Sequence, residues 1–314
     1  MVGDLLFTVN TVAPLMLVML AGFLARRLRI MDDVGVKQAN SAVFHIFLPV
    51  LLCMNIADTP AGLAVDVRTL LFGLLGVLCS FLLLFALAPR LCPPREARGV
   101  FIQGVARSNY AIYGIPLVML MYPGAETSVA ALMVVAVVPL FNVMSTVALM
   151  AYRGTRASVW GMVRGVLTNP LIIGTLLGFV LWRLRWPMPD VLHTPLKLLG
   201  GVATPLALFL LGASINFGKA RANLRLLALG VTGRLVLLPA LFLGLAVLFG
   251  IRDVALATLV AVFASPTAVS SYPMAQQIGG DADLAAAQVV FTTALSGITV
   301  FAWVFVLRTL GFLG

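Results

Sequence analysis

Charged residues are few in this chain. They make up 10% of the 314 residues, whereas a soluble globular protein carries roughly 25%. Hydrophobic residues make up 61%, and the mean hydropathy is +1.09. The three cysteines, Cys53, Cys79 and Cys92, are too few and too scattered to form a disulfide framework. These features exclude a soluble protein with a single anchor and predict an all-α polytopic membrane protein.

Acidic residues are scarcer still. All 11 Asp and Glu residues fall in connections or near the ends of apolar runs. Only two histidines occur, His45 and His193, and neither belongs to a metal-ligand spacing. No nucleophile, base and metal lie at one depth, so an enzyme is not expected. We predict no metal and no cofactor, and the lack of deep carboxylates argues against a cation exchanger built on buried aspartates.

Ten apolar runs are long enough to cross a bilayer, which takes about 20 residues. The start of the chain lacks the basic region of a cleavable signal, so the first run is expected to remain as a span. The ten predicted spans are Leu5–Ala25, Gln38–Ile56, Leu70–Ala88, Val100–Met121, Val129–Tyr152, Val166–Trp182, Leu196–Ile215, Leu224–Phe249, Val254–Ile278 and Leu284–Leu310.

The two halves of the sequence resemble each other at one offset. Pro14 and Pro170, Gly22 and Gly178, and Pro49 and Pro205 are each 156 positions apart. We therefore predict two units, 1–156 and 157–314. Each unit holds five spans, an odd number, so the second unit should be inverted in the membrane relative to the first.

Positive charge is in excess, with a net charge of +10. A nucleic-acid partner would explain such an excess, but these Lys and Arg residues stand in short connections, where orientation in the bilayer explains them. Six lie on the side predicted to be outside, which would carry both termini. Twelve lie on the predicted cytoplasmic side: Arg26, Arg27, Arg29, Lys37, Arg90, Arg95, Arg98, Arg153, Arg156, Lys219, Arg221 and Arg225.

The fourth and ninth spans are interrupted at their centres by polar residues, Arg107-Ser108-Asn109 in one and Ser265-Pro266-Thr267 in the other. Ser108 and Ser265 are 157 positions apart. Hydrocarbon cannot satisfy exposed backbone groups, so such breaks are tolerated only inside protein or beside water. Paired breaks in corresponding halves indicate a transport site, so we predict that the break residues Ser108, Asn109, Ser265, Pro266 and Thr267 bind the substrate. The alternative is that both are ordinary proline kinks.

Two half-helices that restart at these breaks would direct the positive ends of their dipoles at one point, which suits a carboxylate. Tyr110, directly after the first break, would line the pocket or simply pack. Gly114 and Pro116 after the first break, and Pro273 after the second, are predicted to let the two segments cross closely. We assign these last three a structural role.

Two arginines, Arg107 and Arg234, are predicted at membrane depth. A buried arginine is costly unless it faces a partner or water, so each is a candidate for binding an anion. Alternatively, Arg107 bonds the carbonyls that end its own half-helix, and Arg234 reaches the interface. Asn142, in the span that follows the first break, is the other polar candidate.

The motif from Arg107 to Leu117 and its counterpart from Ala264 to Pro273 resemble those of the auxin efflux carrier family. Phe47-Leu48-Pro49, Asn169-Pro170-Leu171 and Pro139-Leu140-Phe141-Asn142 add to this likeness, which covers the whole chain. Length and span count are similar to those of bacterial members.

The resemblance implies a fold like that of plant PIN auxin exporters and bile acid sodium symporters. Spans one, two, six and seven would form a scaffold and homodimer surface. Spans three to five and eight to ten would form a mobile transport domain that works as an elevator. By the same resemblance, Asn109 would bind the substrate carboxylate and Pro266 would be the crossover proline. Ser108 replaces a proline of the plant exporters.

We therefore predict a secondary transporter in a bacterial inner membrane, with both termini periplasmic. Its substrate would be a small organic anion such as a malonate-like or auxin-like acid. One alternative is a sodium-coupled symporter of the bile acid type, although no acidic residue at mid-depth accompanies Gln276 and Gln277. The other is a membrane sensor that binds the anion without moving it.

Overall fold

The computed structural model of the protein describes residues 2–60, 66–122, 128–153, 158–215, 218 and 223–313, with the backbone alone for 2–11, 115 and 159. Helices account for 84% of the chain, and the described part contains no strands. The predicted boundary between the two units, after residue 156, lies outside the described residues. So do three of the twelve predicted cytoplasmic charges, namely Arg156, Lys219 and Arg221.

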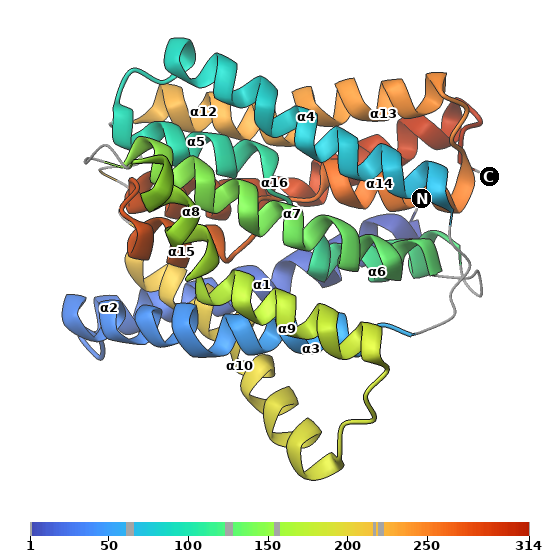
Figure 1. The fold of residues 1–314 in the computed structure, drawn as a ribbon. Helices are drawn as coiled ribbons and strands as arrows, with labels where there is room; N and C mark the ends of the chain where they lie inside the picture. The colour runs from blue at the N-terminus through green and yellow to red at the C-terminus, as the bar shows by residue number, and fades with distance from the viewer. Residues whose placement is uncertain are drawn as a thin grey trace.

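The helices follow one another with short connections (Figure 1). Their bounds are α1 Val2–Arg27, α2 Asp33–Ala42, η1 Val43–Phe47, α3 Leu48–Ala57, α4 Val67–Leu91, α5 Arg95–Ala106, α6 Tyr110–Met121, α7 Ser128–Tyr152, α8 Val159–Leu167, α9 Pro170–Leu184, α10 Asp190–Ser214, α12 Leu224–Thr232, η2 Gly233–Leu237, α13 Leu238–Leu248, α14 Asp253–Ala264, α15 Ser271–Ile278 and α16 Ala282–Thr309.

Six described helices are long and apolar enough to cross a membrane. A seventh is added if α8 and α9, bent by 56° from each other, count as one span. The predicted sixth span is thus not one straight helix, because Asn169 caps α9 and Pro170 begins it. All ten predicted segments are helical, but α5, α6, α14 and α15 are half-length pieces. The count of ten spans therefore stays a prediction.

The helix boundaries recur along the chain at the offset found in the sequence. Arg29 and Arg185, 156 apart, both end a helix region in the left-handed conformation, with φ of 58° and 50°. Three pairs of helical segments begin and end 157 or 158 positions apart: Asp33–Ala57 with Asp190–Ser214, Val67–Leu91 with Leu224–Leu248, and Arg95–Ala106 with Asp253–Ala264.

Two repeated glycines allow close helix contacts. A Cβ on Gly22 of α1 would lie 1.8 Å from the backbone oxygen of Phe209 in α10. A Cβ on Gly178 of α9 would lie 2.5 Å from the backbone oxygen of Cys53 in α3. Each glycine thus lets two helix backbones touch, which is the physical reason for its recurrence in both halves.

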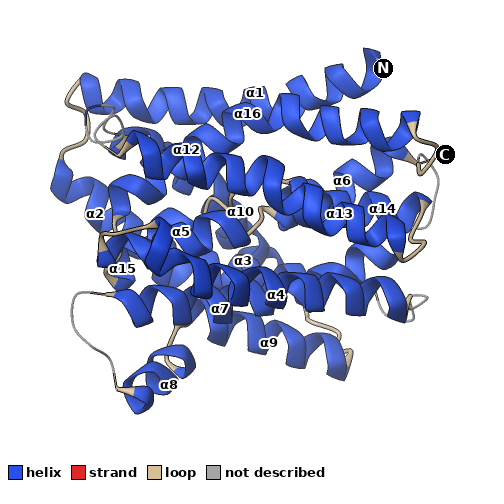
Figure 2. Ribbon diagram, turned by 90° about the horizontal axis from the view of Figure 1, so that it is seen from above, coloured by secondary structure: helices blue, strands red, loops and turns tan. Residues whose placement is uncertain are grey.

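The helices are arranged in layers (Figure 1). The segments α2, α3 and α9 run along one side, α4, α12 and α13 run along the opposite side, and α5, α7, α14 and α16 lie between them. Helix α10 packs on α1 and α3, and its first half projects from the body. Seen from above, α1 runs beside α16, and α1 begins at the end of the molecule where α16 finishes (Figure 2).

Two π-helical turns, η1 and η2, each precede a proline. Pro49 and Pro239 lack an N–H, so the carbonyl four residues before each has no helical donor. A local π-turn accommodates such a site without ending the helix. The second of these turns carries Arg234.

Candidate functional site

The two predicted breaks meet in space. The chain leaves α5 at Arg107 and leaves α14 at Ser265, and Ser108 forms an isolated antiparallel bridge with Thr267. The backbone N–H of Asn109 donates to Pro266 at 2.8 Å, and that of Ala268 donates to Arg107 at 3.4 Å. The residue opposite Ser108 is Thr267 rather than Ser265, because the second break is longer: α14 ends at Ala264, whereas α15 begins only at Ser271.

Two hydroxyls of the second break donate to backbone carbonyls of the helices that end at the crossing. Pro266 cannot donate a backbone hydrogen bond, so the helix stops there. The hydroxyl of Ser265 donates to Ala261 at 2.5 Å, and that of Thr267 donates to Gly104 at 2.6 Å. Ser265 and Thr267, which we predicted as substrate ligands, thus use their hydroxyls to hold the crossing, and neither lines the cavity described next.

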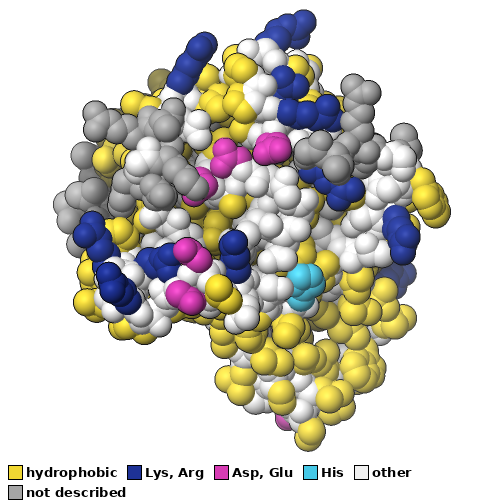
Figure 3. Space-filling view, turned by 90° about the vertical axis from the view of Figure 1, so that its left-hand side faces the viewer, with side chains coloured by type: hydrophobic (Ala, Val, Ile, Leu, Met, Phe, Trp, Pro, Cys, Tyr) yellow, Lys and Arg dark blue, Asp and Glu magenta, His cyan; other side chains and the backbone are white. Residues whose placement is uncertain are grey.

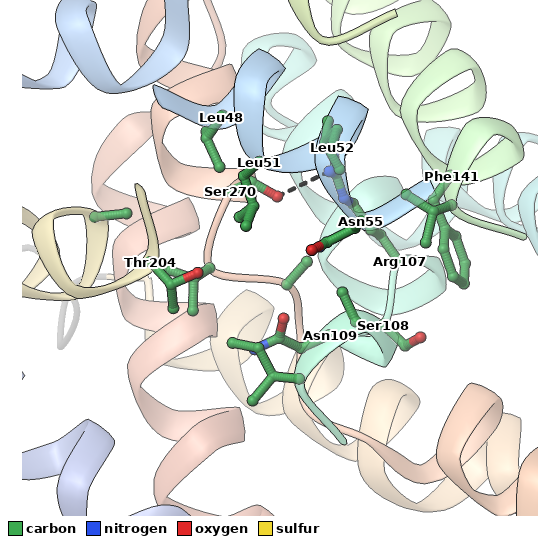
Figure 4. A pocket seen from close by; sticks show the side chains of 16 residues that line it. Leu48, Leu51, Leu52, Asn55, Arg107, Ser108, Asn109, Phe141, Thr204 and Ser270 are labelled. Atoms are coloured by element: carbon green, nitrogen blue, oxygen red, sulfur yellow. Dashed lines mark hydrogen bonds between the residues drawn. The ribbon is translucent and has the colours of Figure 1, made fainter. Parts of the chain in front are cut away.

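A cavity of roughly 230 Å³ lies beside the crossing, among α3, α7, α10 and the two breaks. In Figure 4 the side chains of Asn55, Arg107 and Asn109 surround this space. The other wall residues are mostly apolar, including Leu51, Ile112, Phe141 and Ala207. The polar residues that line the cavity are Asn55, Arg107, Ser108, Asn109, Thr204 and Ser270.

Two of these lining residues have unused polar atoms. The hydroxyl of Ser108 and the Nδ2 amide group of Asn109 are buried and have no hydrogen-bond partner among the described residues. Asn109 stands at the N-cap position of α6, yet its side chain makes no capping bond. A buried polar group without a partner costs free energy, and the amino end of a helix favours an anion. The arrangement therefore suits a ligand with an acidic oxygen.

Arg107 adds a positive charge to the same cavity. Its Nη2 donates to Oδ1 of Asn142 at 2.7 Å and to Oγ of Ser270 at 2.8 Å, and Nη1 contacts the sulfur of Met274. It does not bond the carbonyls of its own half-helix, as one alternative held. The described residues include no carboxylate that pairs with it.

Asn142 holds the Arg107 guanidinium group by accepting a hydrogen bond from it. Its Nδ2 donates to Oγ1 of Thr175 in α9 at 3.2 Å, and the residue is fully buried and does not line the cavity. The predicted importance of Asn142 thus corresponds to a contact with Arg107. Ser270 was not among the predicted site residues, although its position four residues after Pro266 in a polar stretch was a usable signal.

Arg234 lies outside the cavity lining. It is fully buried, and its guanidinium group donates to the carbonyls of Val105, Ala106, Val262 and Ser265. These carbonyls belong to the ends of α5 and α14. The interfacial position that we considered for Arg234 is therefore not the one observed, because its partners are backbone groups at the crossing.

The remaining predicted residues do not line the cavity. The hydroxyl of Tyr110 donates to Ala130 at 2.8 Å, and a Cβ on Gly114 would lie 2.6 Å from the Tyr110 ring, so this glycine makes room for that ring. Pro116 is exposed within α6, and Pro273 is the third residue of α15, where its missing N–H costs nothing.

The fold and this cavity define a helical, multi-pass membrane protein with a cavity at a helix crossing. Residues 7–304 match the family model described as membrane transport protein. The chain therefore belongs to this auxin efflux carrier-type membrane transport family, and it is a transporter rather than an enzyme. A comparison with curated proteins gave no match.

Proposed function

We propose that this protein is a secondary transporter that moves a small organic anion, bound through a carboxylate, across a bacterial inner membrane. The observation that carries the proposal is the cavity at the crossing. One wall is lined by Ser108 and Asn109, whose buried hydroxyl and amide Nδ2 have no hydrogen-bond partner among the described residues, and another by Arg107, which pairs with no described carboxylate. A carboxylate would accept from these donors and supply the missing negative charge.

The repeated helix boundaries support two inverted five-span units. The cavity lies between two groups of helices, and each group contains helices from both units. We name α1–α3 with α8–α10 the scaffold group, and α4–α7 with α12–α16 the transport group. Leu48 and Thr204 of the scaffold group face Arg107, Asn109 and Ser270 of the transport group across the cavity. A substrate between two such groups is what an elevator mechanism requires.

The homodimer that we propose would form through the exposed apolar surface of the scaffold group. The first half of α10 forms an apolar lobe at the lower edge of the molecule (Figure 3). Val191 is 82% exposed and Leu198 is 69% exposed. In a bilayer this surface meets lipid or a second copy of the chain. The charge excess on the predicted cytoplasmic side supports termini that face the periplasm.

The decisive experiment is counterflow in proteoliposomes with radiolabelled malonate and indole-3-acetate. We expect flux of at least one acid, and no dependence on sodium. Substitution Asn109→Ala should reduce this flux at least about tenfold while the protein stays folded, because the Asn109 side chain makes no hydrogen bond to any described residue.

Asn223→Ala is the matched control. Asn223 also stands at a helix N-cap without a capping bond, but it is not part of the cavity. Its variant should transport normally. Carboxylate binding without any flux would replace the transporter by a sensor. Sodium-dependent flux would identify a symporter, and normal flux in Asn109→Ala would remove Asn109 from the site.

A further inference from the structure

Arg234 does not line the proposed substrate site, yet it binds the backbone on both sides of the crossing. We propose that it is a positioning residue, which supplies the hydrogen-bond donors that the two breaks remove and so holds Ser108 and Asn109 in place. The inference rests on the proposed function for its effect on substrate affinity. Its effect on the geometry of the crossing does not depend on that function.

Each break leaves a carbonyl without its helical donor. The carbonyl of Val262 would accept from residue 266, which is a proline and has no N–H. The carbonyl of Val105 would accept from Asn109, whose N–H donates to Pro266 instead. Arg234 replaces both donors, with Nη2 at 3.0 Å from the Val262 oxygen and Nη1 at 3.1 Å from the Val105 oxygen.

The same guanidinium group binds two further carbonyls. Nη1 donates to Ala106 at 3.1 Å, and Nε donates to Ser265 at 2.7 Å. These oxygens lie at the carboxyl ends of α5 and α14, where the helix dipoles place partial negative charge. One buried cation thus neutralises two helix ends. The planar fork of arginine directs donors from three nitrogens, whereas the three donors of lysine all leave a single nitrogen.

The helix that carries Arg234 is itself anchored close to the crossing. Pro239 leaves the carbonyl of Leu235 without a helical donor, and the indole N–H of Trp303 in α16 donates to it at 2.9 Å. A Cβ on Gly233 would lie 3.1 Å from Cγ1 of Val105, so η2 lies against the end of α5. Arg234 is therefore held where all four carbonyls are within reach.

Arg234 acts on the cavity through the crossing strands. It binds the carbonyls of Val105 and Ala106, three and two residues before Ser108, and the carbonyl of Ser265, directly before Pro266. The bridge between Ser108 and Thr267 lies between these two attachments. Loss of the attachments should let the two strands shift, so the donors of Ser108 and Asn109 would no longer converge.

The first test compares Arg234→Lys with Arg252→Met in proteoliposomes supplied with radiolabelled malonate. Arg252 also caps carbonyls, with Nη1 at 2.8 Å from Val247 and 2.9 Å from Ile251, but far from the crossing. We expect Arg234→Lys to raise the apparent KM about tenfold, which corresponds to about 1.4 kcal/mol of binding free energy. Arg252→Met should leave KM unchanged. An unchanged KM in folded Arg234→Lys would overturn the proposal.

The second test needs no transport. In an antiparallel bridge of this type the two Cα atoms are about 4.5 Å apart, which a disulfide can span. We would introduce Ser108→Cys and Thr267→Cys into the full chain with its three native cysteines replaced by alanine. Mild oxidation should join the pair, as measured by mass spectrometry.

Adding Arg234→Lys should lower the yield of this disulfide several-fold, and Arg234→Met should lower it further. Adding Arg252→Met should not change it. An equal yield with and without Arg234 would refute the positioning role even if malonate is not a substrate. Conversely, a lowered disulfide yield in a protein without malonate flux would support the positioning role of Arg234. It would count only against malonate as the substrate.

Discussion

Two buried arginines contact the residues around the crossing and differ in what their guanidinium groups bind. Arg107 meets a side-chain amide, a hydroxyl and a cavity, so part of its charge is available to a ligand. Arg234 meets four backbone carbonyls, so its charge is used within the protein. At the scale of single residues, partner type rather than burial separates a ligand-binding arginine from a positioning one.

This distinction predicts the effect of Arg107→Gln. The change removes the positive charge but keeps a donor that can reach Asn142 or Ser270, so the fold should persist. We expect weaker anion binding, with an apparent dissociation constant raised at least about tenfold. Isothermal titration with malonate would measure it, and Arg107→Lys should lie between the variant and the wild type. Equal affinity in all three proteins would show that Arg107 does not bind the anion and has a structural role.

At the scale of helices, two features matter most: where each helix ends and how closely it packs on its neighbours. The half-helices α5 and α14 are each 12 residues long and stop at the breaks, whereas α1 and α10 pack along each other through Gly22. The first feature places polar groups inside the membrane protein. The second provides a close, rigid contact within the scaffold group.

At this scale we predict that Gly22→Ala lowers stability. The added methyl would overlap the Phe209 backbone oxygen, 1.8 Å away, and helix backbones cannot yield as a flexible side chain does. Such overpacking costs about 1–3 kcal/mol. Thermal unfolding in detergent should show a lowered midpoint.

Gly201→Ala is the control for this prediction. Gly201 also lies within α10, but a Cβ there would meet nothing within 4 Å. Alanine favours a helix over glycine by about 1 kcal/mol, so this variant should be as stable as the wild type or slightly more stable. Equal loss of stability in both variants would contradict the role given to Gly22.

At the scale of the whole molecule, polar contacts join the scaffold group to the transport group. The Nδ2 of Asn40 in α2 donates to Oε1 of Gln276 in α15 at 2.5 Å, and the Tyr272 hydroxyl donates to Ser214 of α10 at 2.5 Å. On another side, Asn142 of α7 donates to Thr175 of α9. If the two groups slide past each other during transport, these contacts must break and re-form.

An elevator mechanism therefore predicts that a link between the groups stops transport. We would join Asn40→Cys and Gln276→Cys with a short bifunctional thiol reagent, in a chain without its native cysteines. Flux should fall to background after linking and return after reduction.

The control link joins Asp58→Cys to His193→Cys within the scaffold group, where the native side chains are 2.9 Å apart. This link should not affect flux. Transport that continues while Asn40 and Gln276 positions are linked would exclude sliding at this boundary.

Local composition was sufficient to determine the membrane character of the chain, the helical segments, the two polar breaks and the resemblance to the family that the model match confirms. Each depends on residues close together: apolar runs form helices in lipid, Pro266 removes a donor wherever it stands, and a glycine at 22 or 178 leaves room for a backbone. The repeat was visible for the same reason, since equal local patterns produce equal helix boundaries.

Partners across long sequence distances were decided only by the tertiary structure. Thr267 rather than Ser265 faces Ser108, because the lengths of the two breaks differ. Arg234 binds the carbonyl of a residue 129 positions away, and no local pattern indicates which of two deep arginines faces a cavity. The position of a residue along its helix is local, but its neighbours depend on how helices from both halves pack together.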